Sequence, residues 1–272
     1  MKPDEILNAT INAGVAKSQR SFKSLVLLGI LAGAYIAFAG MASSMASFNL
    51  TANPETFGLG KALSGTVFSA GLVMVVLAGG ELFTGNSLIF ASVLDGKTKV
   101  SMMLRNWVIV YVSNFIGGAL VTYLAVQTGM FNSGAGMLGA VSISVAANKV
   151  NMAFMPALFS GILCNWLVSL AVWMSTGADS TIGKIFAMFF PIWAFVISGF
   201  EHCIANMFFI PAGIMLKANE TLVELSGVTA EKLANLTWSG MAINNLIPVT
   251  IGNIIGGAVC VAAMYWMAVK KK

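Results

Sequence analysis

A single histidine stands in the middle of a long apolar run, directly after a glutamate. His202 is the only histidine of the chain, and Glu201 precedes it. Within Ile185–Leu216 these are the only ionisable side chains apart from cysteine. One unbroken helix of that length would reach about 48 Å at ~1.5 Å per residue, whereas a bilayer core is ~30 Å thick. A break near Ser198 and Gly199 would explain the excess and would place both polar groups at mid-membrane depth.

Ionisable groups at that depth are costly, because insertion scales assign about 2.5–3.5 kcal/mol to one charged residue in lipid. Irregular backbone there is tolerated only where it is buried in protein or lines water. The Glu201–His202 pair therefore either satisfies a contact between helices or lies on a transport path, and the pattern favours the path. The unperturbed pKa of a histidine is about 6.5, so His202 is a candidate proton partner as well as a candidate anion binder.

The composition indicates an all-α polytopic membrane protein. Apolar residues make up 58% and charged residues 9% of the 272 residues, which leaves no room for a sizeable soluble domain. The net charge of +5 is interpreted as loop charge that orients the chain, and no nucleic-acid partner is expected. The cysteines fall in apolar spans without disulfide or metal spacing, so we expect neither a metal nor a cofactor. A membrane-embedded enzyme would need a catalytic constellation, which these residues do not supply.

Apolar runs predict six membrane spans. They cover Leu25–Met45, Ala62–Leu94, Trp107–Val126, Met152–Met174, Ile185–Leu216 and Met241–Val269. Polar connections are expected at Gln127–Asn151 and Asn219–Ser239. The transmembrane domain would therefore occupy residues 25–272.

Residues 1–24 form a separate cytoplasmic segment in this interpretation. Its apolar residues are spaced as on one face of a helix, at Ile6, Leu7, Ile11 and Val15. This spacing predicts an amphipathic helix lying on the membrane surface, with a loosely ordered tail as the alternative.

The distribution of lysine and arginine predicts that both chain ends are cytoplasmic. Six spans place the two termini on one side of the membrane. With the amino terminus inside, the cytoplasmic segments carry Lys2, Lys17, Arg20, Lys23, Lys97, Lys99, Arg105, Lys184 and Lys270–Lys272. The outer segments carry only Lys61, Lys149, Lys217 and Lys232.

The two halves of the chain share motifs in the same order, which predicts an internal repeat. Glu81–Asn86 (ELFTGN) matches Glu201–Asn206 (EHCIAN), and Ser113–Ala119 (SNFIGGA) matches Gly252–Ala258 (GNIIGGA). Each unit has three spans, so the second unit enters the membrane from the opposite side as an inverted repeat. The middle span of each unit, span two or five, is too long and is expected to be broken. Half-helix amino termini facing one pathway would favour an anion.

The polar residues of the first matched pair are expected to be structural. Glu81 and Glu201 would hold the broken backbone by accepting N–H bonds, with Asn86 and Asn206 beside them. The glycine pairs of the second motif would let spans three and six pack closely.

These motifs resemble those of the formate–nitrite transporter family of channels for small monovalent anions. The matching segments are Gly80–Thr84, Lys149 with Phe154, Gly161–Asn165, Ala171–Ser175, Gly199–Asn206 and Asn245–Gly257. The resemblance implies an aquaporin-like protomer of six helices with helices two and five broken. It also implies one pore per protomer, a homopentamer surrounded by membrane lipid, and a location in the bacterial cytoplasmic membrane. Formate is the implied substrate, with hydrosulfide and nitrite as alternatives.

The resemblance also implies roles for individual residues. His202 corresponds to the central pore histidine, Thr84 to a threonine that can hydrogen-bond with it or with substrate, Lys149 to a basic residue of the outer vestibule, and Asn165 to a polar pore neighbour. The apolar constriction would be formed by Phe68, Leu72, Leu82 and Phe195. From the residues alone, Leu82 and Phe195 could be ordinary core, Lys149 a solvated loop residue and Asn165 a contact between helices.

Two questions stay open at this level. The substrate could pass as an anion beside a neutral imidazole, or as the neutral acid after proton transfer, and transport could be passive or coupled to protons. A channel for a neutral solute such as water or glycerol is the other class to consider. The paired Asn-Pro-Ala signature of such channels is absent from the sequence.

Overall fold

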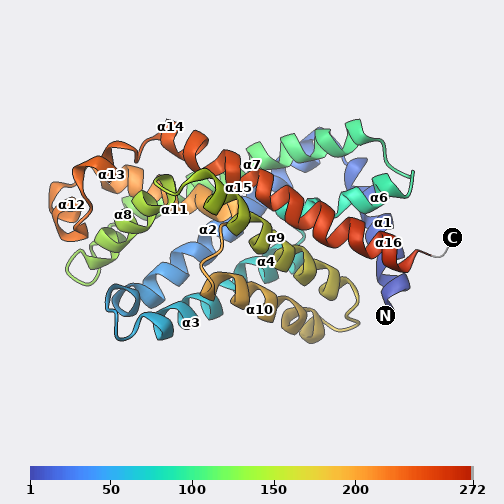
Figure 1. Ribbon diagram of the computed structural model, residues 1–272, viewed down its shortest axis with the longest axis horizontal. Coiled ribbons are helices and arrows are strands. Elements are labelled where there is room, and N and C mark those ends of the chain that lie inside the picture. Colours follow the sequence, from blue (N-terminus) through green and yellow to red (C-terminus); the bar gives the residue numbers. More distant parts are fainter. Residues whose placement is uncertain (271–272) are drawn as a thin grey trace.

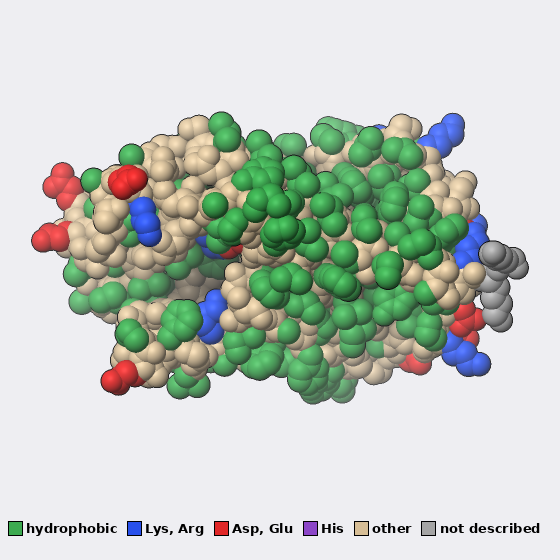
Figure 2. Space-filling model, in the orientation of Figure 1, with side chains coloured by type: hydrophobic (Ala, Val, Ile, Leu, Met, Phe, Trp, Pro, Cys, Tyr) green, Lys and Arg blue, Asp and Glu red, His purple; other side chains and the backbone are tan. Residues whose placement is uncertain are grey.

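The computed structural model describes residues 1–270, and within this range the secondary structure is helical, without strands. Most helices run along the long axis of the molecule, and α1 and α16 lie together at one end of it (Figure 1). A broad apolar surface separates the ends, where most of the charged side chains gather (Figure 2). The predicted all-α membrane protein is confirmed at this level.

By length and composition, five helical segments of the described chain could cross a membrane. They are Phe22–Ala52 (α2), Phe57–Ala78 (α3 and α4), Val100–Gln127 (α7), Phe154–Thr176 (α9) and Trp238–Val269 (α14 to α16). The last segment consists of α14 (Trp238–Gly240), η2 (Met241–Leu246), α15 (Ile247–Ile254), η3 (Ile255–Ala263) and α16 (Met264–Val269). Its two η stretches are π-helical.

The predicted fifth span is made of two shorter helices. α10 covers Thr181–Ile197 and begins after Ser180, whose hydroxyl accepts a hydrogen bond from Gly183 N at 3.0 Å. α11 covers Cys203–Leu216. Between them Gly199 has a φ of +73°, a conformation that side-chain-bearing residues rarely adopt. The chain is thus interrupted where the excess length and the glycine indicated.

A second interruption lies in the predicted second span. Helix α3 covers Phe57–Phe68, and α4 (Ala70–Ala78) follows it and ends at Gly79. The φ of Gly79, +90°, is typical of a left-handed helix cap. Short helices α5 (Phe83–Asn86) and α6 (Ile89–Leu94) follow. Residues 79–82 therefore form an irregular segment, as residues 198–202 do in the predicted fifth span.

Glycines bring α7 and α15–η3 against their neighbours. A Cβ on Gly117 would lie 2.0 Å from the carbonyl oxygen of Ile30 on α2, and one on Gly256 would lie 2.2 Å from that of Ile162 on α9. No side chain larger than hydrogen fits at these positions without moving backbone. The close packing expected of the glycine pairs is therefore with α2 and α9.

The connection Gln127–Asn151 contains structure that its composition did not indicate. After η1 (Met130–Asn132), helix α8 covers Met137–Val150 and packs on α11. Its buried residues include Gly139, Ala140, Ala146 and Ala147, whose small side chains give little hydropathy signal. The connection Asn219–Ser239 likewise holds α12 (Glu220–Ser226) and α13 (Ala230–Ala234).

Helix α1 (Pro3–Ser18) packs on the body of the protein. Leu7 and Ile11, which were expected to face a membrane surface, are 3% and 1% exposed. They belong to a cluster that includes Leu88 just before α6, Trp173 of α9 and Val261 of η3. The amino-terminal helix is therefore a packed element of the fold.

Candidate functional site

Two cavities lie on either side of the irregular segments. The small cavity, about 270 Å³ in volume, lies between α1 and residues 79–82, and its lining includes Lys17, Arg20 and Glu81. The large cavity, about 730 Å³, lies among α2, α3, α8, α10 and α11, and its lining includes Lys61, Lys149 and Glu201. Lysine and arginine atoms are visible beside a recess in the surface in Figure 2. In each lining two basic side chains accompany a single acid.

The four predicted constriction residues lie where the cavities approach each other. Leu72 and Leu82 line the small cavity, whereas Phe68 and Phe195 line the large one. All four are at most 4% exposed. The Phe68 and Phe195 rings meet edge to face with centroids 5.7 Å apart. Leu72 follows Phe68 by about one helical turn, so the two side chains lie on the same helix face, one toward each cavity. These apolar residues form a barrier between the two cavities.

His202 and Thr84 bring the two irregular segments together. Thr84 Oγ1 lies 2.9 Å from His202 Nε2, and His202 Nδ1 accepts a hydrogen bond from Ala205 N at 3.0 Å. Because Nδ1 is occupied as an acceptor, a neutral ring carries its proton on Nε2 and donates it to Thr84. Protonating Nδ1 as well would require the bond from Ala205 to be broken. The geometry therefore holds a neutral imidazole with its donor directed at the Thr84 hydroxyl.

Phe195 covers one face of this histidine. The two rings are stacked, with centroids 5.9 Å apart and an interplanar angle of 25°. His202 is 3% exposed and Thr84 is fully buried. Because both side chains are buried, where the effective dielectric is low, the partner that stays in place after an ion displaces the other would interact strongly with that ion.

Glu201 is held by three side chains on the wall of the large cavity. Lys149 Nζ donates to Glu201 Oε1 at 2.7 Å, and Asn206 Nδ2 and Asn245 Nδ2 donate to Oε2 at 2.7 and 3.2 Å. Asn206 also donates to Asn245 Oδ1 at 2.7 Å, and Asn245 donates to the backbone oxygen of Lys149 at 3.1 Å. A closed network thus fixes the acid and its lysine.

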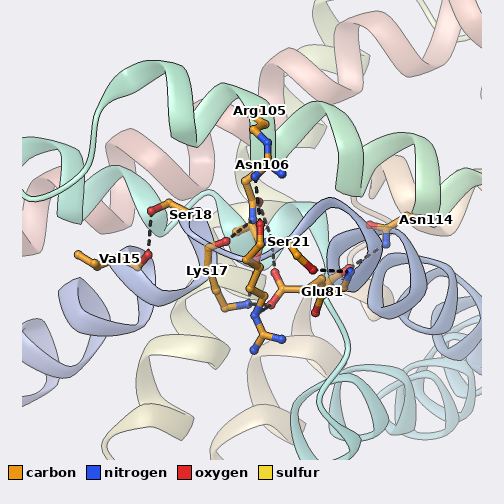
Figure 3. A network of polar contacts seen from close by, with 11 residues as sticks. Val15, Lys17, Ser18, Ser21, Glu81, Arg105, Asn106 and Asn114 are labelled. Atoms are coloured by element: carbon orange, nitrogen blue, oxygen red, sulfur yellow. Dashed lines mark hydrogen bonds and ion pairs between the residues drawn. The ribbon is translucent and has the colours of Figure 1, made fainter.

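The small cavity has the same network with different residues (Figure 3). Lys17 Nζ donates to Glu81 Oε1 at 3.2 Å, and Asn86 Nδ2 donates to Glu81 Oε2 at 2.7 Å. Asn86 Nδ2 also donates to Asn106 Oδ1 at 2.9 Å, and Asn106 donates to the backbone oxygen of Lys17 at 3.1 Å. Lys17 of α1 therefore occupies the place that Lys149 of α8 has in the other network.

Sequence reasoning did not single out Lys17, although a signal was present. Lys17 precedes Gly29 by as many residues as Lys149 precedes Gly161. The backbone oxygens of the two glycines accept equivalent bonds, from Asn114 Nδ2 at 2.7 Å and from Asn253 Nδ2 at 2.8 Å. The sequence match between the two halves of the chain therefore extends back to α1 and α8.

The two networks differ in several contacts. Lys17 Nζ also donates to Asn86 Oδ1 at 2.8 Å, whereas Asn206 Oδ1 has no hydrogen-bond partner within residues 1–270. Arg20 adds a second cation to Glu81, with Nε 3.3 Å from Oε1. The acid of the small cavity is thus bound by two bases, and the acid of the large cavity by one.

Asn114 and Asn253 hold the broken backbone, a role that the sequence interpretation gave to the glutamates. Asn114 accepts from Phe83 N at 3.0 Å and donates to the backbone oxygen of Glu81 at 2.9 Å. Asn253 accepts from Cys203 N at 2.9 Å and donates to the backbone oxygen of Glu201 at 3.0 Å. Both asparagines belong to the strongest repeated motif, whose glycines alone drew attention.

Asn165 lies next to the segment that carries Thr84. Its amide donates to the backbone oxygens of Thr84 and Asn253, at 3.2 and 2.6 Å. It is fully buried and does not line either cavity. Within the described chain it links the segment that carries Thr84 to α15.

The charges of the site are suited to attracting anions. Each cavity has an excess of positive charge, and between the cavities lies an apolar barrier that contains one donor–acceptor pair. Within residues 1–270 no group of three or more histidine, cysteine, aspartate or glutamate side chains is arranged to hold a metal ion.

Known proteins share this chain's sequence and fold over most of its length. The formate/nitrite transporter family model matches residues 4–267. A probable formate transporter of Methanothermobacter thermautotrophicus is 39% identical, with 94% of this chain and 92% of the relative covered. The formate channel FocA of Escherichia coli K12 is 37% identical, with 97% and 93% covered.

A solved structure gives the same result. The chain resembles a pentameric formate channel with formate bound, with a TM-score of 0.79 and 37% identity, over 90% of this chain and 96% of that one. The chain belongs to the formate/nitrite transporter family of integral membrane proteins.

Proposed function

We propose that this protein is a channel for small monovalent anions and that formate is its principal substrate. The observation that carries the proposal is the His202–Thr84 contact at 2.9 Å, set in an apolar barrier between two basic cavities. The formate channels and the formate-bound structure that it resembles support the choice of substrate.

The basic side chains account for the attraction of an anion, and the barrier accounts for selectivity. A formate ion that leaves either cavity must lose most of its water, which is costly unless it gains a hydrogen bond. His202 Nε2–H supplies such a bond once the ion displaces Thr84. The ion then crosses beside the neutral ring. Alternatively, the ring first takes a proton from solvent on Nδ1, which breaks the bond from Ala205 N; the resulting imidazolium gives one proton to formate and returns to the neutral form, and the substrate crosses as formic acid. The two routes differ in their dependence on pH.

The paired networks support the proposed architecture. We infer six spans arranged as two inverted three-helix units, each with a broken middle helix, in a transmembrane channel domain over residues 25–272. The segment 1–24 precedes it and supplies Lys17. The pentameric assembly of the structural relative supports a homopentamer with one pathway per protomer. The adjacent α1 and α16, together with the loop charges, support cytoplasmic termini in a bacterial cytoplasmic membrane.

Hydrosulfide and nitrite are the alternative anions, and a neutral solute is the second alternative. An uncharged solute such as glycerol would gain nothing from paired bases in each cavity, so the charges favour an anion.

Flux into liposomes tests the proposal. Purified protein should admit labelled formate well above the rate of empty liposomes, and ahead of nitrite and hydrosulfide in the same preparation. Glycerol should enter at the background rate. Glycerol flux without formate flux would refute an anion channel, and faster nitrite or hydrosulfide than formate would overturn the choice of substrate.

A further inference from the structure

The large cavity contains a second lysine whose charge is not neutralised. Lys149 Nζ lies 2.7 Å from Glu201 Oε1, and Glu201 is the only acid that lines the cavity. Lys61 lines the same cavity and is half-buried. Within residues 1–270 its side chain has neither an ion pair nor a hydrogen bond: Glu201 is already bound to Lys149, Asn206 and Asn245.

Lys61 stands between the cavity and the barrier. Lys61, Ser64 and Phe68 follow one face of α3, and all three line the cavity. The Nζ atom lies 3.6 Å from the position that a Cβ on Gly199 would take. The ammonium group is therefore next to the interruption between α10 and α11, on the helix face that leads to the Phe68–Phe195 contact.

We propose that Lys61 is the residue that binds and positions the incoming anion in the large cavity. This inference rests on the proposed anion-channel function. The field of a close ion pair falls off faster with distance than the field of a single charge, so Lys149 and Glu201 together attract an anion weakly. Lys61 supplies the net charge of the cavity, and its free donors can bind a carboxylate directly. Lys149 mainly holds Glu201 in place.

A lysine near the end of a membrane helix can also serve only to anchor that helix at the interface. The two roles predict different results. An anchor needs a long polar side chain, whereas anion binding needs positive charge and is sensitive to ionic strength.

The first experiment measures formate uptake against formate concentration for wild type, Lys61→Gln and Lys61→Arg. At an ionic strength of about 0.01 M, where charges act over ~30 Å, we expect Lys61→Gln to raise the half-saturating concentration roughly three- to tenfold. The maximal rate should change little, and Lys61→Arg should stay close to wild type. At about 1 M salt, where the screening length is ~3 Å, the difference should largely vanish. Lys184→Gln is the matched control, because Lys184 is also half-buried but lines neither cavity.

The second experiment changes the charge after folding, so it does not depend on how a variant folds. In Lys61→Cys protein, an aminoethyl methanethiosulfonate restores a positive group of nearly the original length, and a sulfonatoethyl reagent of similar size adds a negative one. The first should restore low-salt affinity and the second should weaken it further. Wild type treated with both reagents controls for Cys164, Cys203 and Cys260.

The outcomes separate the inference from the function on which it rests. If wild type carries formate while Lys61→Gln has the same half-saturating concentration at low salt, or if both reagents have equal effects, the role of Lys61 is refuted. If wild type carries no formate, the proposed function itself fails.

Discussion

Replacing His202 tests the centre of the proposed pathway. The ring makes two contacts, with Thr84 Oγ1 through Nε2 and with Ala205 N through Nδ1. Phenylalanine keeps the shape and the stacking on Phe195 but loses both bonds. Asparagine keeps a donor, and its oxygen can accept the bond from Ala205, because asparagine is a favoured residue at a helix amino terminus.

The size of the effect follows from the lost hydrogen bond. A hydrogen bond to a charged group contributes about 1.5–3 kcal/mol, and each ~1.4 kcal/mol is a factor of ten in rate. An anion crossing a barrier without the Nε2 donor should therefore pass roughly ten- to a hundredfold more slowly in His202→Phe. His202→Asn should retain a substantial part of the flux but lose its pH dependence, since an amide does not titrate between pH 5 and 8.

The assay is formate flux in liposomes from pH 5 to 8 for the three proteins, with oligomeric state measured in detergent to confirm folding. A pH-dependent wild type beside a pH-independent His202→Asn would support proton transfer. Active but pH-independent flux in both would support passage of the anion beside a neutral ring. Equal rates and equal pH profiles for all three proteins would show that the histidine only packs, and the mechanism would be wrong.

Three further predictions concern the barrier, the ion pair and the packing. Phe195→Ala should let lactate pass faster relative to formate, because it removes a buried ring, 3% exposed, from the barrier. An unchanged ratio of the lactate and formate rates would exclude Phe195 as a filter. Lys149→Gln leaves Glu201 buried without its cation and should lower the free energy of unfolding by about 3–5 kcal/mol, whereas Lys149→Arg should preserve part of the ion pair. The melting temperatures of wild type and the two variants check this, and a glutamine variant as stable as wild type would contradict it. Gly117→Ala should lower the free energy of unfolding by about 1–3 kcal/mol or more through overpacking. Gly58→Ala should not destabilise the protein, because nothing lies within 4 Å of the added Cβ. Equal denaturation midpoints for the two variants would refute the packing argument.

The interruptions of the two long spans could be predicted because they follow from length and glycine. A run too long for a bilayer must tilt or break, and Gly199 marked where it breaks with a φ of +73°. His202 and Thr84 lie in contact, an arrangement that the family resemblance implied. Local signals were sufficient there because each interruption is encoded within a few residues.

Elements whose stability depends on distant partners were not predictable in the same way. Helix α8 buries Leu138, Ile143 and Val150 together with Ala146 and Ala147, and the glycine and serines between them conceal this apolar face in the composition of the segment. Lys17 becomes part of a network only because α1 packs beside Glu81, far along the chain. Asn114 and Asn253 look like ordinary polar residues of a membrane helix until the backbone that they hold is known.

The two equivalent networks have an electrical consequence. On the proposed pathway, an ion that enters from either end would meet a lysine–glutamate–asparagine set of similar design, then the barrier, then the other set. A pathway with equivalent ends has little intrinsic preference for direction, so its current–voltage curve in symmetrical formate solutions should be nearly linear. Rectification would have to arise from the groups that differ: Arg20 on Glu81 in the small cavity, Lys61 in the large cavity, and Asn206 Oδ1, which has no hydrogen-bond partner within residues 1–270. Net flux would then follow the gradient, and the same protein would serve for export and for uptake.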